Sequence, residues 1–570
     1  MGALEVQPVG VIMLSIEDLF VVAVVWGVVI VFSWFFSKYL FTVFTGGKSR
    51  LDKFFKPIEN FIYTLSGIES TKNMGWKEYF KALFYLNVAQ AVIALFILMF
   101  QANLPLNPMH YQGMSWSLAL NTVLSFSSNT NLQHYNGETT LSYLSQMSAI
   151  QFLQFTSAAT GLAVGVAILR GFAGKARTIG NFYFDYVRSL TRVLLPLTFI
   201  ATLVLIVLGI PQSLGGYTSI PTLQKDAYEI LYRGPIASLV SIMQLGTNGG
   251  GYFGANSAYP LQNPSQITDF LELGMMMFIP TATLFMFGRM VGDNREGRTL
   301  FLAAYAIYGI DLIIAFLPMA HTGRGLEIGY GGAASVFWTV TTTAFTTGSV
   351  NASLAAFNPV VILSGFIGML IQGAPGGEGI GAMYLIMYVI VTIFLVGLMA
   401  GRTPEYLGIK IEGRDVKLAV MAFLTHPIII LVPTVLAFAI GAEKAAGLTA
   451  NSIGFTQIFY EFTSSAANNG SDFLGASGNT IFFNVTTGIV MWLGRYLPML
   501  FMLAIADSVA VRKRTPSQGL KTGTISFVVI LVVSIFILTV LTFFPFLVLG
   551  PILQFLESFK TSLGGVIFAL

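Results

Sequence analysis

Long runs of apolar residues alternate with short polar connections along almost the whole chain. Ten of these runs reach the roughly 20 residues that a helix needs to cross a bilayer. They are centred near Val28, Ala91, Ala159, Thr202, Met277, Ile310, Val389, Val432, Met491 and Ile535. The pattern predicts an all-α polytopic membrane protein with about ten transmembrane helices, in a single integral membrane domain over residues 1–570.

Composition narrows the class of protein further. Of the 570 residues, 55% are hydrophobic and 10% are charged, against a charged share of about 25% in soluble proteins. The 58 glycines suit membrane helices, in which small residues let backbones approach closely. Cysteine is absent, which excludes disulfides, thiol nucleophiles and cysteine metal sites.

Basic residues collect in every second connection. If the N-terminus lies outside, 24 of the 30 Lys and Arg residues fall in the inward connections 37–81, 170–192, 289–298, 402–417 and 512–521. The outward connections hold only Lys225, Arg233, Arg324 and Lys444. The positive-inside rule therefore predicts that both termini face outward. Residues 1–17 contain no Lys or Arg, so we expect the first helix to be retained, not cleaved as a signal peptide.

A second pattern recurs four times on the outward side. After spans two, four, six and eight, an apolar stretch too short to cross is followed by a polar run and then by the next span. The short stretches are 115–128, 235–246, 334–345 and 453–465, and the polar runs are 128–133, 246–253, 346–349 and 467–471. The predicted organisation is four pseudo-symmetric membrane–pore–membrane repeats over 79–172, 188–292, 299–401 and 416–510, with extra spans at 10–45 and 523–549.

The polar runs suggest a chemistry. A helix that stops partway through a membrane leaves carbonyls unpaired, which is tolerated only where the segment is buried in protein or lines a watery cavity. Carbonyls that face such a cavity can replace the hydration shell of a cation, as in potassium-channel filters. No acidic residue lies in the four runs, which favours a monovalent ion over calcium or magnesium. One such loop is most often only a turn, whereas four at equivalent places predict a pore, most plausibly for potassium.

Three ionisable residues lie in or beside the predicted spans and loops, and each has both a functional and a structural interpretation. Arg495 lies in the ninth span, where a charge at the bilayer centre costs about 2.5–3.5 kcal/mol. A cationic gate, or a partner for a carboxylate below the filter, is favoured over a structural ion pair. For Asp311, in the sixth span, a structural role is favoured. His134 borders the first polar run, and a loop residue that faces water is the favoured interpretation.

Nothing in the sequence predicts ATP hydrolysis by this chain. Gly46-Gly47-Lys48-Ser49 resembles the end of a phosphate-binding loop, but Thr42 stands where that motif needs its first glycine. The longest inward connection, 37–81, is too short for a nucleotide-hydrolysing domain of usual size. We therefore expect no enzyme activity in the chain itself and an energy source in another chain. The glycine-rich segment Gly373–Gly381 predicts a break in the seventh membrane helix.

Several longer motifs are similar to those of one family. They are Gly75-Trp76-Lys77-Glu78-Tyr79, Leu104-Pro105-Leu106-Asn107-Pro108, Gly137-Glu138-Thr139-Thr140-Leu141-Ser142-Tyr143, Gly246–Phe253 with Asn256, and Gly401-Arg402-Thr403-Pro404-Glu405-Tyr406-Leu407-Gly408. Over essentially its whole length the chain resembles KdpA, the potassium-binding subunit family of the Kdp potassium-transporting ATPase. The resemblance implies a fold like the superfamily of K+ transporters and a location in the plasma membrane of a prokaryote.

The resemblance also implies partners and ligands. The partners would be a catalytic P-type ATPase subunit (KdpB), a single-span accessory subunit (KdpC) and a small membrane peptide (KdpF), in a lipid bilayer and without nucleic acid. The ion would be K+, with no organic cofactor. By similarity K+ would be held at Asn129, Thr130, Asn131, Gln133, Thr247, Asn248, Gly249, Asn256, Thr346, Thr347, Gly348, Asn468, Asn469 and Gly470. Arg495 matches an arginine that the family carries below the filter.

Two departures from the family pattern concern the loops. The third loop carries threonines where the family often has Ser-Cys. The fourth loop reads Asn468-Asn469-Gly470 where three asparagines are commoner, which leaves its register open by one residue.

Three functional hypotheses follow. The leading hypothesis is a potassium-binding and translocating subunit of an ATP-driven, high-affinity uptake pump, which selects K+ through a four-loop filter on its outer face. The alternative is a stand-alone K+ channel or a Trk/Ktr-like K+ uptake protein. A non-transporting scaffold that only anchors an enzyme is the third, and the four loops argue against it.

Overall fold

The computed structural model describes residues 15–224, 227–317, 329–514 and 519–558. Within this part, ten helical segments are long and apolar enough to cross a membrane. Their main helices are α1 (Ile16–Thr45), α3 (Trp76–Phe100), α7 (Phe152–Ala173), α9 (Leu195–Val207), α11 (Gln266–Val291), α12 (Asn294–Phe316), α15 (Ile380–Met399), α16 (Gly413–Ala439), α19 (Ile481–Ala510) and α20 (Ile525–Leu547). Every predicted centre lies in one of them, so the prediction of a ten-span all-α membrane protein is confirmed.

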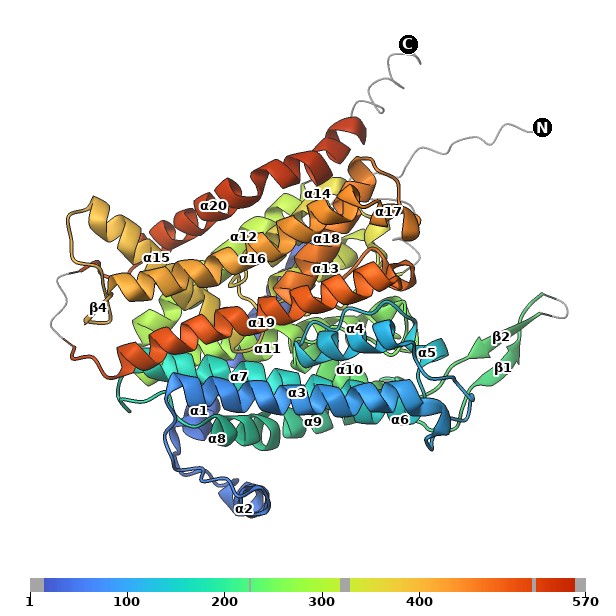
Figure 1. Cartoon of the computed structure of the whole chain (residues 1–570), viewed down its shortest axis with the longest axis horizontal. Helices are drawn as coiled ribbons and strands as arrows, with labels where there is room; N and C mark the ends of the chain where they lie inside the picture. Colours follow the sequence, from blue (N-terminus) through green and yellow to red (C-terminus); the bar gives the residue numbers. More distant parts are fainter. Residues whose placement is uncertain (1–14, 225–226, 318–328, 515–518, 559–570) are drawn as a thin grey trace, which may run out of the picture.

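Spans three and four each contain a π-helical turn in their first half. Span three starts at α6 (Tyr143–Ser145) and continues through a π-helical turn, Gln146–Gln151, into α7. Span four starts at α8 (Phe182–Arg188) and passes through a second π-helical turn, Ser189–Leu194, into α9. In Figure 1 the spans run roughly along the horizontal axis, packed as one bundle.

Four short helices lie among the spans. They are α4 (Trp116–Ser127), α10 (Ile236–Leu245), α13 (Gly332–Ala344) and α18 (Ser452–Ala467). These bounds agree closely with the predicted short stretches. All four helices lie toward the end of the bundle that carries the hairpin of β1 (Thr218–Pro221) and β2 (Tyr228–Leu231), away from the end that carries β4 (Ile409–Lys410) (Figure 1). We refer to them as the pore helices.

The predicted break in the seventh membrane region is confirmed. Helix α14 (Pro359–Leu370) stops inside the bundle, and α15 begins at Ile380. The intervening segment, 371–379, is named the break segment. Gly376 and Gly379 have left-handed φ values of 75° and 72°, which side chains rarely adopt. A β-carbon on Gly165 of α7 would overlap the backbone of Gly379, so α7 lies directly against the break segment.

Helix α7 is the inner helix of the bundle. It is apolar on nearly all sides and almost all of its residues are buried, as expected of a helix surrounded by protein. Its many small residues, such as Ala159, Gly161 and Ala163, let neighbouring helices approach closely.

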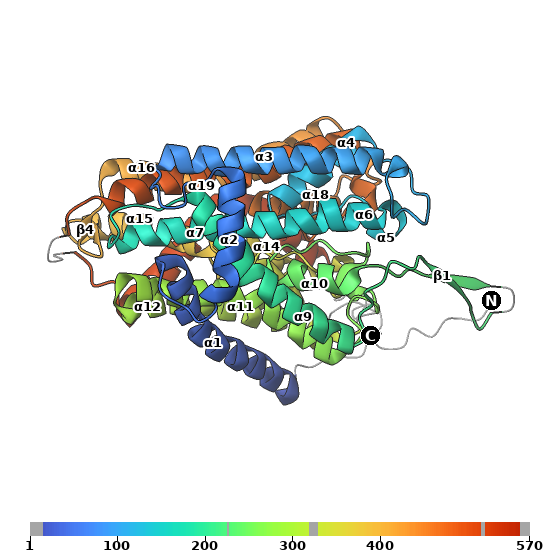
Figure 2. The same ribbon diagram turned by 90° about the horizontal axis from the view of Figure 1, so that it is seen from below.

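The connections carry the remaining elements. Helices α5 (Gly137–Thr140) and α17 (Ala442–Ala445) are single turns. Strand β1 (Thr218–Pro221) pairs antiparallel with β2 (Tyr228–Leu231), and β3 (Glu405–Tyr406) pairs antiparallel with β4 (Ile409–Lys410). Helix α2 (Asp52–Ser66) lies across the direction of the spans (Figure 2).

Ion pairs hold α2 against span four. Arg192 donates to both carboxylate oxygens of Glu59, and its Nη1 lies 2.6 Å from Asp52 Oδ1. The side chains of Arg192 and Glu59 are almost completely buried. The opposite face of α2 exposes Phe54, Phe61 and Leu65. One face of this amphipathic helix is therefore fixed by charge, and the other is apolar and open.

Some predictions fall on residues outside the described ranges. Lys225, Arg324, Lys560, both chain ends and the first residues of the predicted span 10–45 lie there. The outward orientation of the termini stays a prediction.

Candidate functional site

The loops that follow the four pore helices share one backbone conformation. In each loop, the first and third of three consecutive residues have left-handed φ. The pairs are Asn129 (67°) and Asn131 (58°), Thr247 (44°) and Gly249 (94°), Thr346 (47°) and Gly348 (90°), and Asn468 (53°) and Gly470 (106°). Positive φ is uncommon for residues other than glycine, so its recurrence identifies equivalent positions. The fourth loop therefore matches the others as 468–470, which removes the one-residue ambiguity of its register.

The second residue of each loop is tied to its own pore helix. Its backbone N–H donates to a carbonyl five residues earlier, from Thr130 to Ser125 (3.0 Å), Asn248 to Met243 (2.9 Å), Thr347 to Thr342 (2.8 Å) and Asn469 to Ser464 (2.9 Å). These bonds cap the pore helices, whose last carbonyls would otherwise lack partners. They also fix the four loops in the same turn.

The four loops contact one another in cyclic order. A β-carbon on Gly249 would overlap the carbonyl oxygen of Thr347, and one on Gly348 would overlap that of Asn469. A β-carbon on Gly470 would likewise overlap the carbonyl oxygen of Thr130. Loops one and two are joined because Asn129 Nδ2 donates to the Thr247 carbonyl at 2.9 Å. The segments therefore form a closed ring, which we call the loop ring.

The carbonyl groups of the second residues are unusual. Thr130, Asn248, Thr347 and Asn469 are all fully buried. Within the part of the chain that the structure describes, no hydrogen bond reaches any of their four carbonyl oxygens. Buried carbonyls almost always have a partner, so four unpaired ones at equivalent places are suited to binding a cation.

The asparagine side chains mainly form hydrogen bonds that hold the loops in place. Asn129 Oδ1 accepts from Ser157 Oγ (2.8 Å) and from Asn248 Nδ2 (2.7 Å). Asn468 Nδ2 donates to Thr130 Oγ1 (2.9 Å), and Asn469 Nδ2 donates to the Thr342 carbonyl (2.9 Å). Among the predicted ligands, these residues therefore offer a cation their backbone oxygens more readily than their amides.

A cavity of about 270 Å³ opens at the mouth of the loop ring. All four loops contribute to its lining, including the predicted residues Asn131, Gln133, Asn256, Gly348 and Gly470. Asn131 is buried and both polar atoms of its side chain lack a protein partner. Gln133 Oε1 accepts from the Gly251 N–H (2.9 Å), and Asn256 Nδ2 donates to the Gly249 carbonyl (2.7 Å). Gln133 and Asn256 therefore support loop two from the mouth side.

The break segment lies against the other side of the ring. The N–H of Gly376 donates to the Ala344 carbonyl (2.8 Å), and that of Glu378 donates to Thr247 Oγ1 (3.2 Å). A β-carbon on Gly377 would crowd the hydroxyls of Thr346 and Thr247. The first residues of loops two and three therefore rest on the break segment.

Two buried ionisable groups lie here, Arg495 beside the break segment and Glu378 within it. Arg495 is 6% exposed and its Nη2 donates to the Ser157 carbonyl (3.2 Å). Among the described residues no carboxylate lies within 4.0 Å of Arg495. The alternative interpretation of Arg495, a structural ion pair, therefore has no counterpart in this part of the chain. Both carboxylate oxygens of Glu378 are buried without a partner. No role was predicted for Glu378, although an acidic residue inside a glycine-rich apolar segment was a signal.

His134 occupies a different environment from the one expected. The prediction that it faces water is wrong, because it is 1% exposed. Its Nδ1 lies 2.7 Å from Asn484 Oδ1 and its Nε2 lies 3.0 Å from Glu461 Oε1. Burial, and then the charge of Glu461, raises the pKa of the nearby Asp472 to about 7. His134, Glu461 and Asn484 form a buried polar layer behind loops one and four, and Asp472 lines the mouth cavity.

A second buried carboxylate supports loops two and three. Glu272 Oε2 accepts from Gln244 Nε2 (2.7 Å) and from Ser257 Oγ (2.8 Å), and Ser349 Oγ donates to Gln244 Oε1 (3.0 Å). Asp311, predicted to be structural, accepts from Ser364 Oγ (2.7 Å). Sequence reasoning did not identify Glu272, because its partners become neighbours only in the folded chain.

These features define a class of protein. A bundle of membrane-spanning helices surrounds four re-entrant loops, whose unpaired carbonyls form one ring. This is the architecture of a cation-selective membrane transport protein.

Comparison with known proteins identifies the family. The family model for the potassium-transporting ATPase A subunit, KdpA, matches residues 23–556. A potassium-transporting ATPase potassium-binding subunit from Caldanaerobacter subterraneus subsp. tengcongensis is 41% identical over 539 residues, which cover 91% of this chain and 96% of that relative. The chain therefore belongs to the KdpA family, the A subunits of potassium-transporting ATPases.

Proposed function

We propose that the loop ring is a potassium selectivity filter, and that this chain binds and translocates K+ for an ATP-driven, high-affinity uptake complex. The observation that carries the proposal is the set of four buried carbonyls without hydrogen bonds, on Thr130, Asn248, Thr347 and Asn469. Backbone carbonyls of the other ring residues complete the ligand set, and Asn131, Gln133 and Asn256 serve at the mouth.

Charge supports a monovalent ion. The ring itself carries no carboxylate. Of the acidic groups around it, Glu461 and Glu272 lie behind the loops, and Asp472 lines the mouth cavity. Calcium usually recruits carboxylate ligands, whereas neutral carbonyl ligands suit a weakly hydrated monovalent ion. The pore helices direct their C-terminal ends toward the ring, and the partial negative charge there attracts cations.

The chain works with a partner that hydrolyses ATP. The relative's name places a potassium-binding subunit within an ATPase, and the helices of the described chain are taken up almost entirely by spans and pore helices. The partner would be a catalytic P-type ATPase subunit (KdpB), joined by KdpC and KdpF in the plasma membrane, with the loop ring and both termini facing outward. The four predicted repeats each contribute one loop to the ring.

Arg495 and the break segment form the proposed gate. The guanidinium lies below the ring, with no carboxylate within 4.0 Å in the described part of the chain, so its positive charge opposes a cation that moves inward from the filter. The break segment supports Thr247 and Thr346 from the same side. A shift of this segment would change the filter and the barrier together.

The test is to purify the chain with its native partners and to measure ATPase activity with and without K+. The proposal expects K+ to stimulate hydrolysis and the chain alone to hydrolyse nothing. A chain that purifies alone and conducts K+ in liposomes without ATP would instead be a channel or a Trk/Ktr-like protein.

A further inference from the structure

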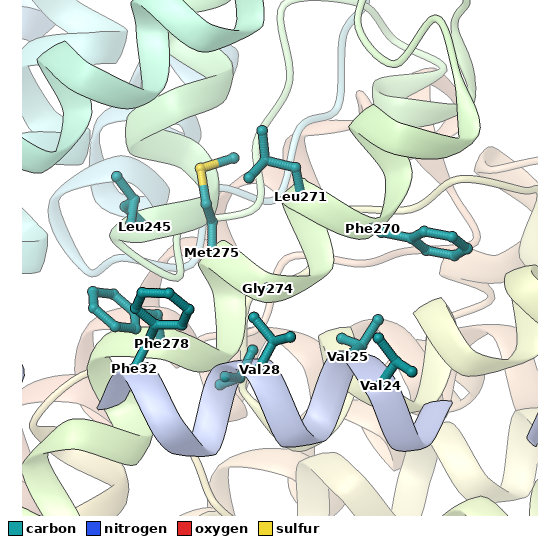
Figure 3. Close-up of a pocket in the computed structure, with 11 residues that line it drawn as sticks. Val24, Val25, Val28, Phe32, Leu245, Phe270, Leu271, Gly274, Met275 and Phe278 are labelled. Atoms are coloured by element: carbon teal, nitrogen blue, oxygen red, sulfur yellow. The ribbon is translucent and has the colours of Figure 1, made fainter. Parts of the chain in front are cut away.

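A groove outside the loop ring runs along the seam between α1 and α11. Its volume is about 450 Å³. Its lining includes Val24, Val28 and Phe32 of α1, Gly274 and Met275 of α11, and Leu245 of α10. Every lining residue is apolar or glycine. Figure 3 shows Val25 and Val28 of α1 facing Gly274 of α11 across the groove. We name this feature the seam groove.

The seam groove opens toward hydrocarbon. Both helices are membrane spans, and the lining residues lie well inside each of them. Val24, Val28 and Phe32 are 44%, 51% and 63% exposed, so one wall of the groove faces the surroundings of the bundle. At this depth of a bilayer those surroundings are lipid chains.

The other wall reaches the pore helix of loop two. Leu245 is the last residue of α10. It is followed by Gly246 and by Thr247, whose backbone φ is left-handed. Leu245 and Met275 are only 3% and 6% exposed. The groove therefore connects the lipid-facing surface with the base of one quarter of the loop ring.

Shape selects among hydrocarbon occupants. Helices α1 and α11 pack directly against each other along the seam. A transmembrane helix, about 10–12 Å across, could therefore place side chains over the mouth but could not enter between them. A single extended chain of methylene groups can enter. Gly274 leaves room for it, because a β-carbon there would meet only Val29 Cγ2 at 3.8 Å.

We propose that the seam groove binds one acyl chain of a membrane phospholipid, which packs against Leu245 at the base of the second pore helix. The lining offers no hydrogen-bond donor or acceptor side chain, so the interaction is hydrophobic and proportional to the apolar area covered. The site lies outside the ion path, and the proposal does not depend on which ion the ring selects.

The test uses the intact complex in vesicles of phosphatidylethanolamine and phosphatidylglycerol. These contain a tracer phospholipid with a photoactivatable diazirine midway along one acyl chain. After illumination, labelled peptides are mapped by mass spectrometry. The expected result is several-fold stronger labelling of residues 270–278 and of Leu245 than of lipid-facing positions elsewhere on α1.

Two variants fill the groove from opposite walls, and one serves as a matched control. Gly274→Leu and Val28→Phe should each reduce labelling of Leu245 several-fold. Gly27→Leu adds the same side chain on α1 at similar depth, but Gly27 is exposed, has nothing within 4 Å and does not line the groove. It should leave labelling unchanged.

Two results would overturn the proposal. Uniform labelling around α1, with none at Leu245 in the unmodified complex, would exclude a bound chain. Crosslinks from the Val28→Cys variant to a partner subunit, with Leu245 unlabelled, would assign the groove to a protein helix. The labelling needs neither K+ nor ATP, so its failure is distinguishable from failure of the proposed transport function.

Discussion

The carbonyl oxygen of Thr130 occupies the place where a side chain on Gly470 would begin. This contact joins the fourth loop to the first, although the two residues are 340 positions apart in the sequence. Equivalent contacts join Gly249 to Thr347 and Gly348 to Asn469. Each glycine therefore serves two purposes, a left-handed turn and a close approach to the next carbonyl.

Gly470→Ala should impair ion binding. Left-handed backbone costs roughly 1–2 kcal/mol for a residue with a side chain, and the overlap with Thr130 adds to this cost. We expect the K+ concentration that half-stimulates ATPase activity to rise by about tenfold or more. Gly441→Ala is the control, because its φ is 73° and it has nothing within 4 Å. Equal effects of the two variants would mean that the contact with Thr130 is unimportant.

Asn256→Gly should weaken discrimination among monovalent ions. The Asn256 amide holds the Gly249 carbonyl at 2.7 Å, and glycine removes the amide while keeping the left-handed φ of 54°. A hydrogen bond of about 1 kcal/mol corresponds to roughly a fivefold change in preference. The measurement is the ratio of half-stimulating concentrations of K+ and Rb+. Asn451→Gly removes only a helix cap far from the ring, and an unchanged ratio in both variants would contradict the role of Asn256.

Arg495→Gln should open a leak. Removal of the buried positive charge below the ring lowers the barrier to an inward-moving cation. Liposomes containing the complex should then release Rb+ several-fold faster without ATP. Asp311→Asn, which replaces a buried carboxyl group elsewhere in the bundle, should not leak. Tight vesicles with Arg495→Gln would refute the gating role.

Glu59→Ala should destabilise the attachment of α2. It leaves Arg192, whose side chain is 1% exposed, without its main partner, and breaking a buried pair typically costs about 3–5 kcal/mol. Lys56→Ala is the matched control, because the Lys56 side chain is 54% exposed in its 3.2 Å pair with Asp52, and ion pairs of exposed lysines contribute about 0–1 kcal/mol. The apparent unfolding temperature of the purified complex should fall clearly only for Glu59→Ala. Equal shifts would indicate that Arg192 finds other partners.

The spans were predictable because hydropathy is a sum over about 20 residues and tolerates local exceptions. The loops were predictable because the same order of short helix and polar run recurs four times. Their detailed geometry was not, since the register of the fourth loop depends on the φ values of Asn468 and Gly470. The sequence of the fourth loop shows which residues are present but not which of them adopt left-handed φ.

Side-chain roles were the hardest to foresee. His134 looked like a water-facing loop residue because its partners, Glu461 and Asn484, are 327 and 350 residues away. Asn129 was predicted to hold K+ by similarity, and its side-chain amide joins loop one to loop two and to Ser157. Such roles arise only when distant segments meet, and no local pattern encodes them.

One position in the loop ring differs from its three counterparts. Asn131 stands where the other loops have Gly249, Gly348 and Gly470, and Gly250 of loop two leaves space for its β-carbon. In an assembly of four identical subunits, any substitution would be copied into every quadrant at once. Here one chain carries all four quadrants as four separate loop sequences. A substitution can therefore change one oxygen position while the other three stay as they are.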